Sequence, residues 1–182
     1  MHYQTPWHHI ILDNFLPSSD LERIQSMLPK HRDGFLMEEE DIQEIKYKFL
    51  PDLQLAKRLM SEEFKVKLQD LSGLNLKLNQ KSLVQLRLMT PDSPAFPIHI
   101  DSQDEDSLIC ILYLSPNWQK ECGGELLLHL DNESQADSAK SKTVEPIENR
   151  MIIFRSKDNH WHSVNRVQNW LRYTVIMEWL VN

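Results

Sequence analysis

The sequence predicts an α+β fold that is mainly β: a double-stranded β-helix, or jelly roll, with N-terminal helices packed on one sheet. Two observations support this prediction. Apolar residues recur at helical spacing in residues 1–73, whereas residues 74–182 show the shorter period of strands separated by polar or turn-rich stretches. Seven or eight such strands after a helical segment are typical of two packed sheets with helices on one face.

The first third of the chain is expected to provide mostly helical support. HHIILDNF reads as a short opening strand, and Ser19 and Glu22 have the spacing of a capping box, which predicts a helix running to about Pro29. The charged stretch GFLMEEEDIQE shows no pattern. Helical spacing then returns and ends near Gly73, and it is carried by Leu53, Ala56, Leu59, Met60, Phe64, Leu68 and Leu71.

The remaining residues are expected to form the jelly-roll core of one domain spanning 1–182. The segment DNESQADSAKSK has the composition of an exposed loop within that domain rather than of a linker between domains. The strand-like stretches are LNLKL, LVQLRLM, FPIHI, LICILYL, GELLLHL, RMIIF, HWHSV and YTVIMEWLV.

Composition and charge narrow the possible functions. A net charge of −7 disfavours broad attraction to nucleic acid or anionic membranes. No apolar run approaches the roughly 20 residues of a membrane helix, and the N-terminus lacks the pattern of a signal peptide. The cysteines, Cys110 and Cys122, are expected to be reduced thiols, so we expect a cytoplasmic protein.

The pair His99 and Asp101 is the first candidate for metal binding. Residues two apart in a strand project from the same face, so this imidazole and carboxylate can reach one ion. His162, 61 residues after Asp101, offers a second imidazole, although His160 projects from the same face and is an alternative. Two imidazoles and one carboxylate leave coordination positions open, as suits Fe(II) in oxygenases, whereas structural zinc is usually closed by four ligands.

Arg172 is a candidate for binding a dicarboxylate next to the metal. A hairpin centred near Val167 would place His162 and Arg172 across from one another on the same face. The apolar neighbours Leu171 and Val175 to Met177 indicate burial, and a buried guanidinium requires an anionic partner, for which two parallel hydrogen bonds to a carboxylate are well suited.

In order and spacing, the motifs HID, LICILYLSPNW, CGGELLLH, EPIENRMIIF, HSV and LRYTVIMEW resemble the prolyl-hydroxylase-like branch of the Fe(II)/2-oxoglutarate dioxygenases. The resemblance covers residues 74–181 and extends more loosely to the helical N-terminal third. It implies the cupin-like jelly roll, the cofactor Fe(II), the cosubstrates 2-oxoglutarate and O2, and ascorbate as a candidate reductant.

The resemblance assigns roles to five residues. The iron ligands would be His99, Asp101 and His162, because the Ser-Val pattern after His162 favours it over His160. Arg172 would bind the distal carboxylate of 2-oxoglutarate, and Tyr113 would hydrogen-bond the same cosubstrate.

Other positions match structural features of the family or depart from its pattern. Gly123 and Gly124 match a turn that brings two strands close, and Asn149 with Arg150 matches a structural turn. Met89 stands near the place of a family tyrosine. In addition, Ser115 replaces the usual asparagine, and these two departures concern the substrate more than the iron.

The expected reaction is hydroxylation of a prolyl residue, or of a free or carrier-bound amino acid, with release of succinate and CO2. The substrate is expected to be a small molecule, a peptide or a protein, recognised by the N-terminal helices, MEEEDIQEIKYKF and DSPAFP. An alternative is a catalytically silent jelly roll that senses metal or 2-oxoglutarate. Oxidative demethylation of nucleic acid is disfavoured by the acidic composition.

The remaining histidines and tryptophans are expected to be structural. Trp161 and Trp179 are interpreted as packing residues and Trp118 as lying under the Gly-Gly turn. The histidines expected to be exposed or to have satisfied hydrogen bonds are His2, His8, His9, His31 and His129.

Overall fold

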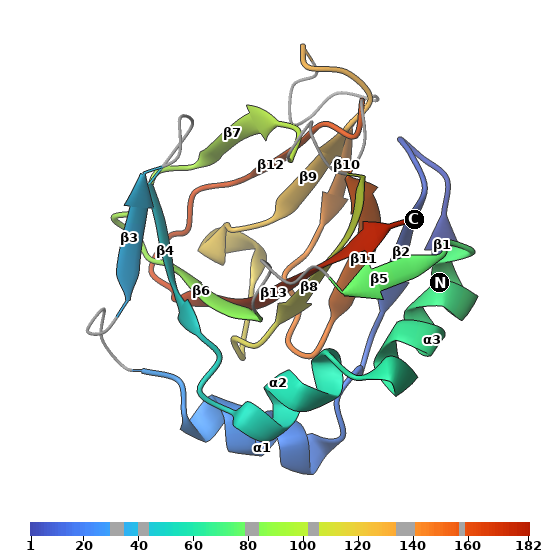
Figure 1. Ribbon diagram of the computed structural model, residues 1–182. Helices are drawn as coiled ribbons and strands as arrows, with labels where there is room; N and C mark the ends of the chain where they lie inside the picture. The colour runs from blue at the N-terminus through green and yellow to red at the C-terminus, as the bar shows by residue number, and fades with distance from the viewer. Residues whose placement is uncertain (30–34, 40–43, 79–83, 102–105, 134–140, 157–158) are drawn as a thin grey trace.

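A computed structural model of the chain shows two antiparallel β-sheets packed face to face, with helices covering one of them (Figure 1). The larger sheet has the order β1-β2-β11-β8-β13-β6-β4-β3, with β5 also paired to β13, and the smaller sheet has the order β10-β9-β12-β7. The structure describes residues 1–29, 35–39, 44–78, 84–101, 106–133, 141–156 and 159–182.

The strands of the larger sheet come from both ends of the chain. They are β1 (His2–Tyr3), β2 (His9–Leu12), β3 (Leu36–Glu39), β4 (Glu44–Phe49), β5 (Leu76–Leu78), β6 (Gln85–Met89), β8 (Ser107–Tyr113), β11 (Met151–Ser156) and β13 (Arg172–Val181). The smaller sheet contains β7 (Phe96–His99), β9 (Leu126–His129), β10 (Ser141–Val144) and β12 (His162–Val164). All eight strand-like stretches predicted from the sequence thus contain a strand, and the jelly-roll prediction is confirmed.

Three helices lie on the face of the larger sheet that points away from the smaller sheet (Figure 1). They are α1 (Ser18–Ser26), α2 (Leu53–Leu59) and α3 (Glu62–Ser72). The Asp52 side chain caps α2, the Ser61 hydroxyl caps α3, and Gly73 ends α3 with a φ of 70°.

The capping box predicted for the first helix is wrong. Pro17 is the N-cap of α1, no side chain caps it, and the helix ends at Ser26 rather than near Pro29. A proline suits a helix start because its fixed φ matches the helix and its missing N–H would have no intrahelical partner.

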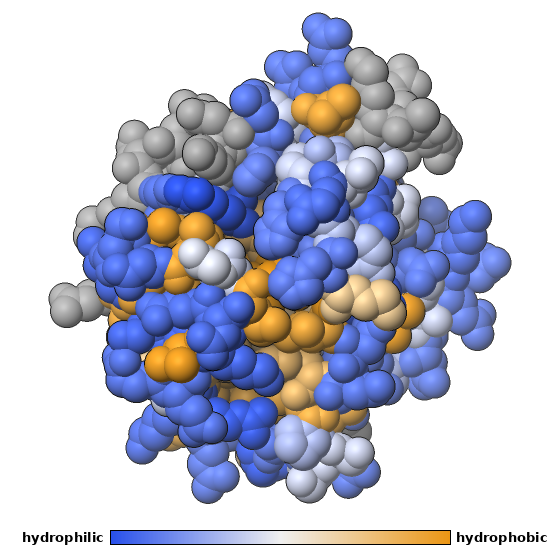
Figure 2. Space-filling model, turned by 90° about the vertical axis from the view of Figure 1, so that its right-hand side faces the viewer, coloured by the Kyte–Doolittle hydropathy of each residue, from blue (hydrophilic) through white to orange (hydrophobic). Residues whose placement is uncertain are grey.

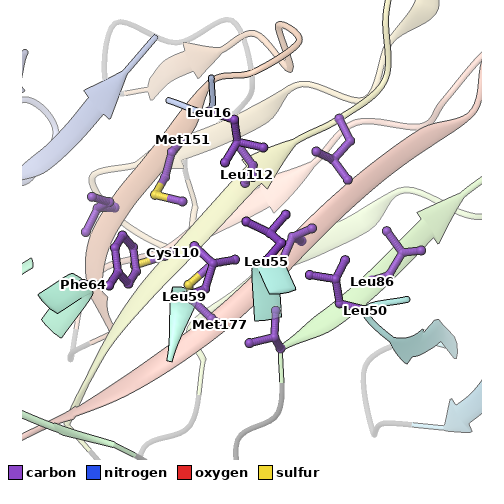
Figure 3. Close-up of a cluster of buried hydrophobic side chains, with 14 of the residues drawn as sticks. Leu16, Leu50, Leu55, Leu59, Phe64, Leu86, Cys110, Leu112, Met151 and Met177 are labelled. Atoms are coloured by element: carbon purple, nitrogen blue, oxygen red, sulfur yellow. The ribbon is translucent and has the colours of Figure 1, made fainter. Parts of the chain in front are cut away.

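The helices and the larger sheet enclose an apolar core (Figure 3). Leu55 and Leu59 of α2 and Phe64 of α3 pack on side chains of β6, β8 and β13, including Leu86 and Leu112. This core ties the helices firmly to the sheet whose other face lines the site described below.

Residues 1–73 are less helical than predicted, because four strands lie there. The stretch read as charged and unpatterned contains β3 and the first residue of β4, and these two strands pair antiparallel at one edge of the larger sheet. Edge strands commonly carry charged residues, and these hide the alternation that identifies a strand. β10, an edge strand of the smaller sheet, likewise occupies the end of the predicted loop, and residues 134–140 of that loop lie outside the described residues.

The molecular surface is mainly polar, with apolar residues gathered toward the middle of the face seen in Figure 2. Within the described ranges, no helix combines the length and apolarity needed to cross a membrane.

Candidate metal centre and its buried polar pocket

Three side chains of the smaller sheet converge at one point. His99 ends β7, Asp101 follows two residues later, and His162 begins β12 directly across from His99. One ligand atom from each lies within 4.8 Å of the others, with His99 Nε2 3.6 Å and His162 Nε2 3.5 Å from the Asp101 carboxylate. Among the described residues this is the one such group of three, and it consists of the predicted residues.

Backbone carbonyls orient both imidazoles toward this point. Nδ1 of His99 lies 2.9 Å from the Pro97 carbonyl oxygen, and Nδ1 of His162 lies 3.0 Å from that of His160. Each Nδ1–H donates to its carbonyl in the neutral tautomer, which leaves the lone pair of Nε2 facing Asp101. This outer hydrogen bond is the usual arrangement of metal-binding histidines, so the geometry fits a divalent metal ion.

The electrostatics of the three residues favour a cation between them. Crowding by protein atoms alone would raise the pKa of Asp101, but His162 and His99 hold it far below its usual range. For His162, burial alone would lower the pKa, but the Asp101 carboxylate raises it. Asp101 is therefore an anion that stabilises positive charge beside both rings.

The predicted hairpin between His162 and Arg172 does not exist. β12 belongs to the smaller sheet and β13 to the larger one, and Val167 between them forms an isolated bridge with Gly123. Arg172 nevertheless faces the interior between the sheets. The equal spacing from Val167 suggested a hairpin, but in a jelly roll consecutive strands can cross from one sheet to the other.

Arg172 is a buried cation on the inner face of the larger sheet. It is 5% exposed, its guanidinium carbon lies 5.2 Å from the centre of the Tyr113 ring, and Nη1 lies 3.7 Å from Sδ of Met89. Burial lowers the pKa of Arg172. Its Nε has no hydrogen-bond partner within the described part of the chain, as expected of a site that binds an anion.

Gly124 makes room for this guanidinium. A Cβ added there would lie 3.0 Å from Arg172 Cδ and 3.2 Å from Val167 Cγ2, and its φ of 77° also disfavours other residues. The neighbouring Gly123 has a φ of 65°, and a Cβ there would lie 2.1 Å from the Arg166 carbonyl oxygen. The Gly-Gly turn is thus required for close approach, as predicted.

Two hydroxyl groups beside Arg172 also lack partners among the described residues. The Tyr113 OH and Thr174 Oγ1 are buried, and the two residues pair across β8 and β13. Burial raises the pKa of Tyr113, so its hydroxyl stays protonated and can donate. Arg172 Nε, the Tyr113 hydroxyl and Thr174 Oγ1 are thus three buried polar groups without partners among the described residues. A carboxylate has two oxygens that accept hydrogen bonds, so it is an anion that all three groups can bind.

Thr174 was missed by the sequence reasoning. The signal that could have identified it is its position two residues after Arg172 in a strand, which places both side chains on the same face.

His160 does not belong to the metal centre. Its Nδ1 lies 2.5 Å from the Arg155 carbonyl oxygen, and its ring stacks on Trp7 with the centroids 4.7 Å apart. His160 therefore fixes the path of the chain into β12, and His162 alone from this pair reaches the metal centre.

The other histidines are mostly structural. His129 is buried, and its ring nitrogens lie 2.8 Å from the hydroxyls of Ser141 and Ser163. His9 is buried as well: its Nδ1 lies 2.9 Å from the Trp7 carbonyl oxygen, whereas its Nε2 has no partner among the described residues, so the expectation of a satisfied side chain holds for one ring nitrogen only. His2 is exposed, His8 is half-buried and His31 lies outside the described residues.

The predicted structural residues pack as expected. Trp118 donates from Nε1 to the Gly123 carbonyl oxygen at 2.9 Å, and Trp179 is 2% exposed in the core. Asn149 has a φ of 60°, and its side-chain amide exchanges two hydrogen bonds with the backbone of Leu16. Ser115, at the position where the family has asparagine, accepts a hydrogen bond from the Tyr173 N–H at 2.7 Å.

Comparison with protein families finds a match over the jelly-roll core. The model described as the 2OG-Fe(II) oxygenase superfamily matches residues 84–180, a segment that contains the metal centre and the buried polar pocket. Prolyl 3-hydroxylase OGFOD1 of Mus musculus is 25% identical over 169 residues, which cover 89% of this chain and 30% of that protein. The chain thus spans less than a third of the length of this relative.

Solved structures share the fold. A Pseudomonas putida prolyl-4-hydroxylase superposes with a TM-score of 0.69 and 18% identity, covering 96% of this chain and 92% of that one. A Trichoplax adhaerens prolyl hydroxylase, solved with a peptide fragment of the hypoxia inducible factor oxygen degradation domain, gives 0.68 and 21%, covering 95% and 83%.

Proposed function

The chain belongs to the 2OG-Fe(II) oxygenase superfamily, and we propose that its Fe(II) is held by His99, Asp101 and His162 and that it hydroxylates a prolyl residue. Proteins of this superfamily are dioxygenases that use Fe(II), 2-oxoglutarate and O2. The observation that carries the proposal is the convergence of three metal-binding donor atoms within 4.8 Å, together with a buried arginine, Arg172, whose Nε has no hydrogen-bond partner among the described residues.

Arg172, Tyr113 and Thr174 are the proposed ligands of the distal carboxylate of 2-oxoglutarate. The Arg172 guanidinium supplies the charge, and the two hydroxyls can donate to the carboxylate from neighbouring strands. Gly124 allows Arg172 to adopt this position, because the absence of a side chain at Gly124 leaves space for the aliphatic part of the arginine.

When bound, iron, 2-oxoglutarate and O2 would together supply the oxidation of an unactivated C–H bond, with one oxygen atom entering the substrate and the other entering the succinate that forms with CO2. The chain's own residues orient the ligands and exclude water. Asp101 remains ionised throughout, while the carbonyls of Pro97 and His160 fix the tautomers of the two histidines. Apolar side chains between the sheets, including Phe154 and Leu128, keep this region dry.

A prolyl substrate, or failing that a free or carrier-bound amino acid, is supported by the names of the relatives, which are prolyl hydroxylases. The net charge of −7 favours a peptide or small molecule over nucleic acid. The two free cysteines support a cytoplasmic location. Residues 1–182 are proposed to act as one domain, since strands from both halves of the chain share the larger sheet.

The test is an anaerobic titration of the protein with Fe(II) and 2-oxoglutarate, followed through the visible charge-transfer band of the chelate. We expect the band in the wild type and its loss in Asp101→Ala and His162→Ala. His2→Ala is the matched control, because His2 is exposed on β1. His129 is unsuitable as a control, since its ring bonds to both Ser141 and Ser163.

Turnover is then measured as succinate release in air with prolyl peptides and free amino acids. Substrate-stimulated succinate supports the hydroxylase, whereas an unchanged band in Asp101→Ala would refute the proposed metal ligands. A band without stimulation by any substrate would favour the silent sensing module.

A further inference from the structure

His129 is a buried histidine of the smaller sheet that is not a member of the metal centre. It ends β9, the strand between β10 and β12 (Figure 1), and it is 1% exposed. Leu126 and Leu128 of β9 pack in the core between the sheets, so the His129 side chain lies on the opposite face of this strand. Any effect of His129 on the metal ligands must therefore be indirect.

Two hydrogen bonds from His129 reach β12 on either side of His162. The backbone N–H of His129 donates to the Trp161 carbonyl oxygen at 2.8 Å, and ring Nε2 lies 2.8 Å from Ser163 Oγ. Any residue except proline could make the first bond, but the second requires a polar side chain of this length. His129 thus holds the residue before and the residue after a metal ligand.

The imidazole of His129 is fixed from both sides. Its Nδ1 lies 2.8 Å from the hydroxyl of Ser141 on β10. Burial and the neighbouring charge of His162 hold the pKa of His129 below its usual range, so the ring is neutral and has one donor and one acceptor nitrogen. A serine hydroxyl can pair with either nitrogen, because it both donates and accepts. The ring therefore connects the two neighbours of β9.

β12 is a short strand with irregular pairing on one side. It has three residues, and its register with β7 shifts between His162 and Val164. Its pairing with β9 is in unbroken register over the same residues. The β9 side therefore determines where β12 lies, and the bond between His129 and Ser163 strengthens that side beside the metal ligand.

The position of β12 matters for both imidazoles of the metal centre. His162 begins β12, and His99 ends β7, directly across from it. Within the described part of the chain, β7 pairs with β12 and with no other strand. A displacement of β12 would therefore move His162 and alter the placement of His99 as well.

We propose that His129 is a positioning residue for the metal centre. Through its hydrogen bond to Ser163 it fixes β12, and with it His162 and His99, at the separation that one metal ion requires. Residues that orient metal ligands without touching the ion commonly change the metal affinity. This inference rests on the proposed function and adds to it a residue on the far face of the sheet.

The experiment measures metal binding to the full chain under nitrogen, with Fe(II) alone and with Co(II) alone. Titration gives the affinity, and the visible absorption of bound Co(II) reports the arrangement of its ligands. The melting temperature of the metal-free protein is recorded for every variant. Ser163→Ala and Ser141→Ala form a matched pair, because each removes a hydroxyl from one nitrogen of the same ring, but only Ser163 lies on β12.

Ser163→Ala should weaken Fe(II) binding about tenfold and change the Co(II) spectrum, whereas Ser141→Ala should stay within about twofold of the wild type with an unchanged spectrum. Ser163→Thr keeps the hydroxyl and should retain the affinity and spectrum of the wild type. His129→Leu should lose at least as much affinity as Ser163→Ala. Combining these two substitutions should cause little further loss, because both remove the same bond.

Two results would overturn the inference. One is an equal loss of Fe(II) affinity in Ser163→Ala and Ser141→Ala, which would show that metal affinity follows the general stability of the sheet. The other is wild-type affinity in Ser163→Ala and in folded His129→Leu. A wild type that binds neither metal ion would instead refute the proposed metal centre itself.

Discussion

The two faces of β13 serve different purposes. Tyr173, Val175, Met177 and Trp179 pack against the helices in an apolar core, whereas Arg172, Thr174, Ile176 and Glu178 face the smaller sheet. The helix-side residues bury apolar surface, which stabilises the fold. The inner residues include two polar groups that are buried without partners among the described residues, and such groups cost stability.

A ligand bound between the sheets would supply the hydrogen-bond partners that the polar groups of the inner face lack among the described residues. Buried polar atoms without partners are rare in stable cores, so their concentration on the inner face beside the metal centre indicates that this face is complete only when the ligand is bound. Substitutions on the helix side should therefore change stability alone, and substitutions on the inner side should change cosubstrate binding alone.

Trp179→Ala should produce the largest effect. Trp179 is 2% exposed in the helix-side core, and its truncation should lower the free energy of unfolding by about 3–5 kcal/mol. The affinity for 2-oxoglutarate of the remaining folded protein should be unchanged. Urea unfolding measures the first quantity and titration of the chelate band the second, and a parallel loss of affinity would contradict the separation of the two faces.

Arg172→Met tests the opposite face. Removing the guanidinium should weaken 2-oxoglutarate binding by roughly 100-fold, because a buried charge pair of about 2–5 kcal/mol is lost. Without ligand, the protein should unfold at the same or a higher temperature, since a buried charge whose Nε lacks a partner in the described part of the chain is replaced by an apolar chain of similar length. A large fall in the melting temperature of the ligand-free protein would show that Arg172 has a structural partner instead.

Gly124→Ala acts on the same guanidinium without removing it. The added Cβ would meet Arg172 Cδ at 3.0 Å, so the arginine stem must shift. We expect about tenfold weaker 2-oxoglutarate binding and a stability loss of roughly 1 kcal/mol from the positive φ. Gly73→Ala is the matched control: it has a similar φ of 70° with nothing within 4 Å of the added Cβ, so it should lose stability but keep the affinity.

The sequence was most informative where one strong signal dominated. Continuous apolar runs identified β8, β9 and β11. The family resemblance proposed site roles for His99, Asp101, His162, Arg172 and Tyr113, and the structure brings these five residues to the space between the sheets. Proximity in the sequence led to one wrong prediction. His162 and Arg172 are ten residues apart and were assigned to one hairpin, but they lie on opposing sheets.

Edge strands and isolated polar site residues could not be recognised from the sequence pattern alone. β3 (LMEE) shows no alternation and β4 (EIKYKF) only a short one, and without knowledge of the neighbouring strands these charged segments at one side of the sheet are indistinguishable from a charged loop. Thr174 looks like an ordinary strand residue. Its importance depends on which face of the sheet it occupies and on its neighbour across the strands, Tyr113, and only the three-dimensional arrangement gives both.

Thr174→Val should have the smallest effect and gives the sharpest test of the comparison. Valine keeps the shape of threonine and removes only the hydroxyl, whose Oγ1 is buried without a partner among the described residues. We expect 2-oxoglutarate binding to weaken about three- to tenfold, the value of one hydrogen bond, while the stability of the ligand-free protein stays equal or rises. Val175→Thr, one residue along β13, is the reverse substitution on the helix side, and it should lower stability and leave the affinity unchanged. If instead both variants lost stability and neither lost affinity, the hydroxyl of Thr174 would have a partner within the protein, and the carboxylate pocket would consist of Arg172 and Tyr113 alone.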